Sequence, residues 1–223
     1  MTADRVGASG VGPERSAARP FVSGVILAAG TSSRMQAETP KQLLRVNDRS
    51  LLQVVVESAL ETQLDELIVV LGYRAEDIRG ALAPIDDARL HIAVAAEHRA
   101  GQSRSLWAGL GATDPQSEAA AVLLGDQPGL DATTIDGVLA AWRSQRPRLL
   151  RPEYEGPEGE KRPGHPVVIC RTIWPIMGSL RGDLGAREVI RQHPDWLETL
   201  PLPGTAPVDV DTAEDWNAWV ASR

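Results

Sequence analysis

The stretch VILAAGTSSRM at residues 25–35, followed by PKQLL at residues 40–44, decides how this chain folds and what it can bind. An apolar run predicts a strand that ends at Gly30 in a cluster of hydroxyl side chains. Arg34 and Lys41 follow the glycine by four and eleven residues. Backbone N–H groups and hydroxyls donate to phosphate oxygens, and basic side chains supply the counter-charge. The stretch therefore predicts a loop that holds the polyphosphate of a nucleoside triphosphate.

This loop differs from two widespread phosphate-binding patterns. A Walker A loop needs Gly-x-x-x-x-Gly-Lys-Ser/Thr, and a dinucleotide-binding turn needs Gly-x-Gly-x-x-Gly, and neither follows the first apolar run. The plainer alternative is an ordinary strand-to-helix turn in which Arg34 and Lys41 are surface residues. The other motifs of the chain bear on that choice.

The bulk composition fits a sizeable core beneath an acidic surface. The chain has 223 residues, of which 43% are hydrophobic, a formal net charge of −7 and a pI of about 5.2. This charge disfavours nucleic acid and anionic membranes as partners. We expect a flexible tail over residues 1–20 and a single domain over residues 21–223.

Signals for export or disulfide formation are absent from the sequence. The single cysteine, Cys170, excludes an internal disulfide and a cysteine-cluster metal site. No run of 18 apolar residues predicts a membrane span, and residues 1–20 lack the apolar centre of a signal peptide. We therefore expect a cytoplasmic protein.

Short apolar runs alternate with amphipathic stretches along the chain. Several runs lack polar alternation, which is typical of strands buried on both faces of a parallel sheet. The order indicates a doubly wound α/β domain with right-handed crossovers, and Ser50, Asp131 and Thr212 are predicted helix N-caps. The Pro-, Gly- and Glu-rich segment 151–164 is predicted to be a loop, with a lid as one role for it. Predicted strands cover 23–29, 66–72, 90–95, 120–125 and 166–171, and predicted helices cover 50–63, 74–82, 102–112, 131–143, 183–192 and 213–221.

A second motif, VLLGDQP at residues 122–128, places Asp126 directly after a predicted strand. Ligands of open α/β sheets bind beyond the carboxyl ends of the strands, so we expect Asp126 at the same edge as Gly30. A carboxylate there can bind Mg²⁺, which bridges phosphate oxygens. The alternative is an aspartate that starts a turn before a proline.

A third motif, VDVDTAED, occupies residues 208–215. Alternate residues of an extended segment share one side, so Asp209 and Asp211 are expected to point the same way. Asp211 can complete a two-carboxylate metal site with Asp126. Glu214 and Asp215 are expected to stabilise the first turn of the last helix instead.

Three further segments are candidates for substrate contacts. His165 lies at a strand entrance beside segment 151–164, where it can contact an anionic substrate or simply hydrogen-bond to the backbone. The sequence GDLGAR at residues 182–187 can bind a phosphate or order the lid. The sequence GQSRSL at residues 101–106 can hydrogen-bond a base or ribose, or only cap a helix.

Together and in this order, the motifs resemble the MobA-like nucleotidyltransferase family, and within it the MocA-type molybdenum cofactor cytidylyltransferases. The resemblance covers about residues 24–216. Gln36 stands where the family usually has Gly, and the spacing from Met35 to Lys41 looks more like that of the methylerythritol phosphate cytidylyltransferases. The family's L-A-A-G-x-S-x-R-M is present at residues 27–35, and its lysine is Lys41. Five further family motifs are present: G-Q-S-x-S-L at 101–106, G-D-Q-P at 125–128, G-H-P at 164–166, G-D-x-G-A-R at 182–187 and D-x-D-T-x-E-D at 209–215.

The resemblance implies a Rossmann-like three-layer α/β/α sandwich with a mostly parallel central sheet. It also implies Mg²⁺-dependent transfer of CMP from CTP to a phosphorylated acceptor such as molybdopterin cofactor, with Mn²⁺ as an alternative metal. Ala29, where guanylyl-transferring relatives usually have Gly, favours CTP over GTP. A transient contact with a molybdoenzyme follows from the same resemblance.

The candidate site residues fall into four sets. The catalytic set is Lys41, Arg34 and Asp126, and the metal set is Asp126 and Asp211. The acceptor-binding set is His165, Asp183 and Arg187. The nucleotide-binding set is Leu27, Ala28, Ala29, Gly30, Ser32, Ser33, Arg34, Lys41, Gly101, Ser103, Ser105 and Gly125.

Three alternatives stay open. The first is another transferase, using GTP with molybdopterin or CTP with a small sugar-like phosphate. The second is an oxidoreductase on the same scaffold, although the dinucleotide pattern is missing. The third is a non-catalytic protein that delivers a cofactor, which would need an acceptor pocket but not both carboxylates.

Overall fold

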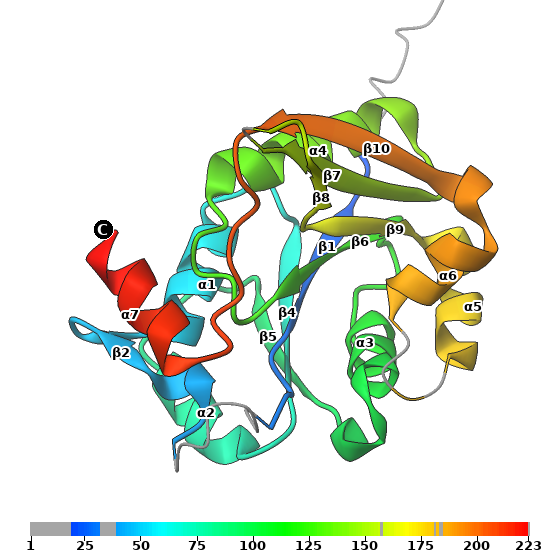
Figure 1. Ribbon diagram of the computed structural model, residues 1–223. Coiled ribbons are helices and arrows are strands. Elements are labelled where there is room, and N and C mark those ends of the chain that lie inside the picture. The colour runs from blue at the N-terminus through cyan, green and yellow to red at the C-terminus, as the bar shows by residue number, and fades with distance from the viewer. Residues whose placement is uncertain (1–18, 32–38, 157, 181, 183–184, 223) are drawn as a thin grey trace, which may run out of the picture.

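The computed structural model describes residues 19–31, 39–156, 158–180, 182 and 185–222. Within them, an eight-stranded sheet runs through the molecule with helices on both faces (Figure 1). The strand order is β10-β7-β9-β6-β1-β4-β5, with β8 paired to β7. The strands are β1 (Val22–Leu27), β4 (Glu66–Leu71), β5 (Leu90–Val94), β6 (Ala119–Leu124), β7 (Leu149–Glu155), β8 (Lys161–Pro163), β9 (Val167–Cys170) and β10 (Leu197–Pro203), and a separate hairpin joins β2 (Arg45–Val46) to β3 (Arg49–Ser50).

Most of the sheet is parallel. Strand β1 pairs in parallel with β4 and β6, β4 with β5, and β10 with β7, whereas β9 runs antiparallel to β6 and β7. All six residues of β4 and nearly all of β1 and β6 are buried, because helices cover both faces. The five strands that the apolar runs predicted are therefore confirmed, with ends that differ by one or two residues.

The helices form the two outer layers. Helices α1 (Leu51–Leu60), α2 (Ala75–Leu82) and α4 (Ala132–Gln145) pack one face of the sheet into a hydrophobic cluster that contains Trp142. Helices α3 (Gln102–Gly111), α5 (Trp174–Ser179) and α6 (Ala186–Gln192) cover the other face around Met177. Helix α7 (Ala213–Ala221) packs Trp216 against the first cluster. The result is the predicted Rossmann-like α/β/α sandwich (Figure 1).

The predicted N-caps are confirmed. The side chain of Ser50 accepts from the backbone of Gln53, and Gln53 returns the bond, which forms a capping box. Asp131 accepts from the backbone of Thr134. Thr212 forms the same reciprocal box at the start of α7.

The prediction of a loop over residues 151–164 is wrong. Strands β7 and β8 occupy most of the segment and form an antiparallel hairpin. Pro152 and the charged residues beside it hid β7, because prolines and charges are depleted in strands. Strand β10 and helix α5 were also not predicted.

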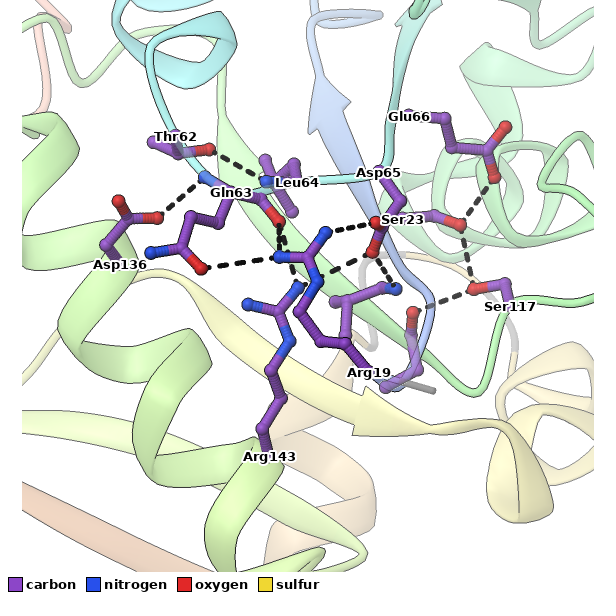
Figure 2. A network of polar contacts seen from close by, with 12 residues as sticks. Arg19, Ser23, Thr62, Gln63, Leu64, Asp65, Glu66, Ser117, Asp136 and Arg143 are labelled. Carbon is purple, nitrogen blue, oxygen red and sulfur yellow. Dashed lines mark hydrogen bonds and ion pairs between the residues drawn. The ribbon is translucent and has the colours of Figure 1, made fainter. Parts of the chain in front are cut away.

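A polar network links residues at the amino-terminal ends of β1 and β4 (Figure 2). The Asp65 carboxylate accepts from the Arg19 guanidinium and lies 3.5 Å from Nη2 of Arg143, which comes from α4. Nearby, the Ser23 hydroxyl donates to Glu66 at 2.5 Å. These contacts link Arg19, the start of β4 and helix α4 at this edge of the sheet.

No helix within the described ranges combines the length and the apolar composition needed to cross a membrane.

Candidate functional site

A cavity of about 720 Å³ lies at the opposite edge, beyond the carboxyl ends of β1 and β6. Its place agrees with the general rule that ligands of open α/β sheets bind beyond the carboxyl ends of the strands. The predicted site residues that line this cavity are Leu27, Ala28, Ala29, Gly30, Lys41, Gly101, Ser105, Gly125, Asp126, Arg187 and Asp211.

The glycine loop is held in place by its neighbours. The backbone N–H of Ala28 donates to the carbonyl of Val70, and the backbone N–H of Gly125 donates to the carbonyl of Leu27 at 3.0 Å. The side chain of Gln42 is buried and donates to the carbonyls of Ala28 and Gly30, at 3.1 and 3.4 Å. A Cβ on Gly125 would lie 2.9 Å from the Ala28 Cβ, so only glycine permits this close approach.

Lys41 joins the two carboxylates of the predicted metal set. Its Nζ lies 2.7 Å from Oδ2 of Asp126 and 2.8 Å from Oδ1 of Asp211. The backbone N–H of Val210 donates to the carbonyl of Asp126 at 2.9 Å, which ties the segment before α7 to the end of β6. Two aspartates that are 85 residues apart in the sequence therefore meet at the glycine loop, as predicted.

Several charged side chains gather in this part of the cavity. Asp126, Asp209 and Asp211 all line the cavity, with Lys41 between two of them. Burial opposes the charge on Lys41, but Asp126 and Asp211 outweigh it and raise the pKa of Lys41. Burial raises the pKa of Asp126, and the carboxylates of Asp209 and Asp211 also raise it, whereas Lys41 lowers it and is outweighed. The three carboxylates repel one another, and a cation bound between them would relieve that repulsion.

The donor set fits a divalent cation that prefers oxygen ligands. Oδ1 of Asp126 is buried and has no hydrogen-bond partner among the described residues. Those residues contain no cluster of three or more His, Cys, Asp or Glu side chains arranged around a metal. Two carboxylates suit Mg²⁺ or Mn²⁺ bound mainly through substrate phosphates and water, rather than a closed protein cage.

Residues at the start of α3 also line the cavity. Gly101 has φ 109°, and a Cβ there would overlap the backbone of Gly182, so the two segments touch through glycine. His98 lines the cavity, and its Nδ1 lies 3.1 Å from the carbonyl of Ala95. A carbonyl only accepts, so Nδ1 carries the proton and Nε2 is left without a partner among the described residues.

Some predicted site residues lie elsewhere. Ser103 does not line the cavity: it is a buried residue of α3, and its hydroxyl has no hydrogen-bond partner among the described residues. His165 lies beside the cavity, within electrostatic range of Asp126 and Arg187. Ser32, Ser33, Arg34 and Asp183 lie outside the described residues.

Sequence reasoning missed two residues, His98 and Arg151. His98 follows the carboxyl end of β5, so the rule that found Asp126 would have found it too. Arg151 belongs to β7, whose composition predicts a loop, and no local sequence pattern indicates a role for it.

His165 makes stability depend on pH. Burial lowers its pKa to about 4, and Arg151 and Arg187 act in the same direction, against Asp126. The unfolded chain binds a proton near pH 6.5, and the folded protein does so only near pH 4, so this stabilisation is lost as pH falls between those values. We expect the loss to reach about 3 kcal/mol.

Urea unfolding at pH 7 and pH 4.5 measures this effect. We expect His165→Asn to lose less stability between the two pH values than the unaltered protein. His91→Gln, at an exposed position of β5, is the matched control and should behave like the unaltered protein. Equal pH dependence in both variants would contradict the assignment.

Comparison with known proteins identifies a family and relatives that match most of the chain or part of it. A family model described as "MobA-like NTP transferase domain" matches residues 24–196. Nicotine blue oxidoreductase of Paenarthrobacter nicotinovorans is 34% identical over 203 residues, which cover 87% of this chain and 94% of that protein. Bifunctional protein GlmU of Burkholderia multivorans is 37% identical over 138 residues, which cover 62% of this chain but only 29% of GlmU.

Solved structures agree with the fold. Rv0371c from Mycobacterium tuberculosis H37Rv superimposes with a TM-score of 0.77 at 28% identity, covering 91% of this chain and 98% of that one. A structure of Rv0371c in complex with manganese gives a TM-score of 0.73 at 27% identity, covering 91% and 100% of the two chains.

Proposed function

The chain belongs to the MobA-like NTP transferase domain family, and from that premise we propose that it transfers CMP from CTP to a phosphorylated acceptor with release of pyrophosphate. Molybdopterin cofactor is the acceptor that the sequence motifs favour. The observation that carries the proposal is the pair of Asp126 and Asp211, which meet on either side of Lys41 beside the glycine loop.

The residues of the chain divide the work of such a reaction. The glycine loop around Gly30 and the side chain of Lys41 hold the triphosphate. Asp126 and Asp211 hold the divalent cation, Mg²⁺ or Mn²⁺, which when bound neutralises phosphate charge and polarises the α-phosphate. The manganese complex of the relative Rv0371c supports a divalent metal of this kind.

The bond changes need no protein nucleophile. An oxygen of the acceptor phosphate forms a bond to the α-phosphorus of CTP, and the bond to the bridging oxygen breaks, so that pyrophosphate leaves with the electron pair. An acceptor phosphate is already ionised near neutral pH, so no general base is required. The contribution of the protein is positioning and charge neutralisation.

The choice of CTP over GTP rests on Ala29, which lines the cavity next to Gly30. The acceptor, a transient contact with a molybdoenzyme and a cytoplasmic location are parts of the same proposal.

An oxidoreductase is the second candidate, favoured by one observation. The relative from P. nicotinovorans, 34% identical over most of both chains, is named an oxidoreductase. Against this candidate, the loop after β1 lacks the glycine pattern of dinucleotide-binding folds. Absorbance of a bound flavin or nicotinamide in the purified protein would favour it.

A nucleotide panel tests the proposed function. The protein is incubated with Mg²⁺, each of the four nucleoside triphosphates and candidate phosphorylated acceptors, and the product is identified by mass. We expect pyrophosphate release and a CMP adduct with CTP and molybdopterin. An adduct with GTP alone would reassign the nucleotide, and no adduct with any triphosphate would contradict the proposal.

A further inference from the structure

Arg151 is a half-buried cation to which the proposed reaction assigns no role. Leu149 and Leu150 of β7 belong to the two different hydrophobic clusters, so the strand alternates between the faces of the sheet. Arg151 therefore shares the face of Leu149, which α5 and α6 cover. Its Nε is buried and has no hydrogen-bond partner among the described residues, and burial lowers the pKa of Arg151.

Two other groups converge on the same place. Arg187, from α6, lines the cavity, and no hydrogen bond or ion pair joins its side chain to another described residue. His165 directly precedes Pro166 and β9, and its Nδ1 is buried without a partner in the described part of the chain. Strand β9 pairs with β7, which brings His165 to the end of the sheet where Arg151 lies.

The two guanidinium groups repel each other. Arg187 acts on Arg151, and both act on His165, so the three groups lie within electrostatic range of one another. Glu153 also acts on Arg151, but its carboxylate lies 3.6 Å from Nζ of Lys161. Two cations face a neutral imidazole, and the carboxylates in range, Glu153 and Asp126, each have a lysine partner of their own.

The strand order places this cluster on one side of the candidate metal site. Neighbouring strands run β7-β9-β6-β1, and they position Arg151, His165, Asp126 and Gly30 in that sequence along the edge of the sheet. The carboxylate of Asp126 thus separates the cationic cluster from the glycine loop. A group bound at the cluster would approach Asp126 from the side opposite to the triphosphate.

We propose that Arg151, Arg187 and His165 form a subsite for a phosphate monoester dianion, and that Arg151 anchors the phosphate of the acceptor. Two guanidinium groups match a charge of −2, and their planar N–H groups pair with phosphate oxygens. The neutral imidazole adds one more hydrogen bond. The identification of the bound phosphate as that of the acceptor rests on the proposed function. The existence of an anion subsite does not.

Titration calorimetry with inorganic phosphate, without nucleotide or metal, tests the subsite. We expect Arg151→Gln and Arg187→Gln each to weaken phosphate binding by about tenfold to a hundredfold. Arg151→Lys should recover part of the affinity, because it restores the charge but not the paired N–H groups. Arg148→Gln is the matched control, since that exposed guanidinium stacks on Trp196 at 4.7 Å and should leave binding unchanged.

Two further measurements separate this subsite from the triphosphate loop. A non-hydrolysable CTP analogue with Mg²⁺ should bind the Arg151→Gln variant as tightly as the unaltered protein, and only the KM for the acceptor should rise. The thermal unfolding midpoints verify that the variants fold. If the unaltered protein binds phosphate as expected but no nucleotide, the subsite stands and the proposed function fails.

Two results would overturn the subsite. One is unchanged phosphate affinity in both the Arg151→Gln and Arg187→Gln variants. The other is phosphate affinity that falls only in a Lys41→Met variant, because the phosphate would then bind at the glycine loop.

Discussion

Replacement of Asp126 by Asn is expected to lower the rate of pyrophosphate release by about 10³-fold or more, while the protein stays folded. Asn keeps the size of the side chain but removes the charge that would hold a divalent cation beside the triphosphate. Oδ1 of Asp126, which has no partner among the described residues, would then carry no negative charge to offer as a ligand.

The same substitution should not destabilise the fold. Burial, together with Asp209 and Asp211, raises the pKa of Asp126 despite the presence of Lys41. An acid whose pKa is raised on folding is held in its ionised form at a cost to stability near neutral pH. Removal of that charge relieves the cost, and Lys41 keeps Asp211 as a partner. Urea unfolding should therefore show an unchanged or higher free energy of unfolding.

Asp209→Asn is the matched control for this prediction. Asp209 lines the same cavity and carries the same charge, but its Oδ1 accepts from the side chain of Gln127 at 2.6 Å. We expect a much smaller loss of rate and little change in Mn²⁺ affinity measured by paramagnetic resonance. Turnover of the Asp126→Asn variant within tenfold of the unaltered protein would remove Asp126 from the metal set.

The central part of the fold could be predicted because burial dictates the sequence there. Strands β1, β4 and β6 lie between two layers of helices, so their residues are apolar on both sides and stand out as continuous runs. Strands β7 and β10 lie toward one edge, where prolines and charges are tolerated, and β10 contains Pro201 and Pro203. Their composition is that of a loop, and only pairing with neighbours makes them strands.

The candidate site was predictable where a local rule applied. Gly30 and Asp126 each follow a buried strand, so their common edge could be inferred from chain order. The contact of Lys41 with Asp211, which are 170 residues apart, depends on how the segment before α7 returns across the sheet. Arg151 lies on a strand whose composition predicts a loop, so no local sequence pattern indicates that it approaches Arg187.

Replacement of Lys41 by Met is expected to slow nucleotidyl transfer by about 10² to 10³-fold and, without nucleotide, to tighten Mn²⁺ binding by about tenfold. The ammonium of Lys41 now lies between the carboxylates of Asp126 and Asp211, where it competes with a divalent cation. A phosphate oxygen would compete with these carboxylates for the N–H groups of Lys41. Met removes that competition and, at the same time, the counter-charge for the triphosphate.

The opposite signs of the two effects make the test sharp. If Lys41 had only a structural role, its replacement would lower both metal affinity and activity. If Lys41 exchanges between the carboxylates and the triphosphate, its replacement raises metal affinity and lowers activity. Lys161→Met is the matched control, because Lys161 is the other lysine of the chain and is exposed on β8. It should leave Mn²⁺ affinity unchanged. Weaker Mn²⁺ binding in the Lys41→Met variant would show that Lys41 organises the carboxylates for the cation instead of competing with it.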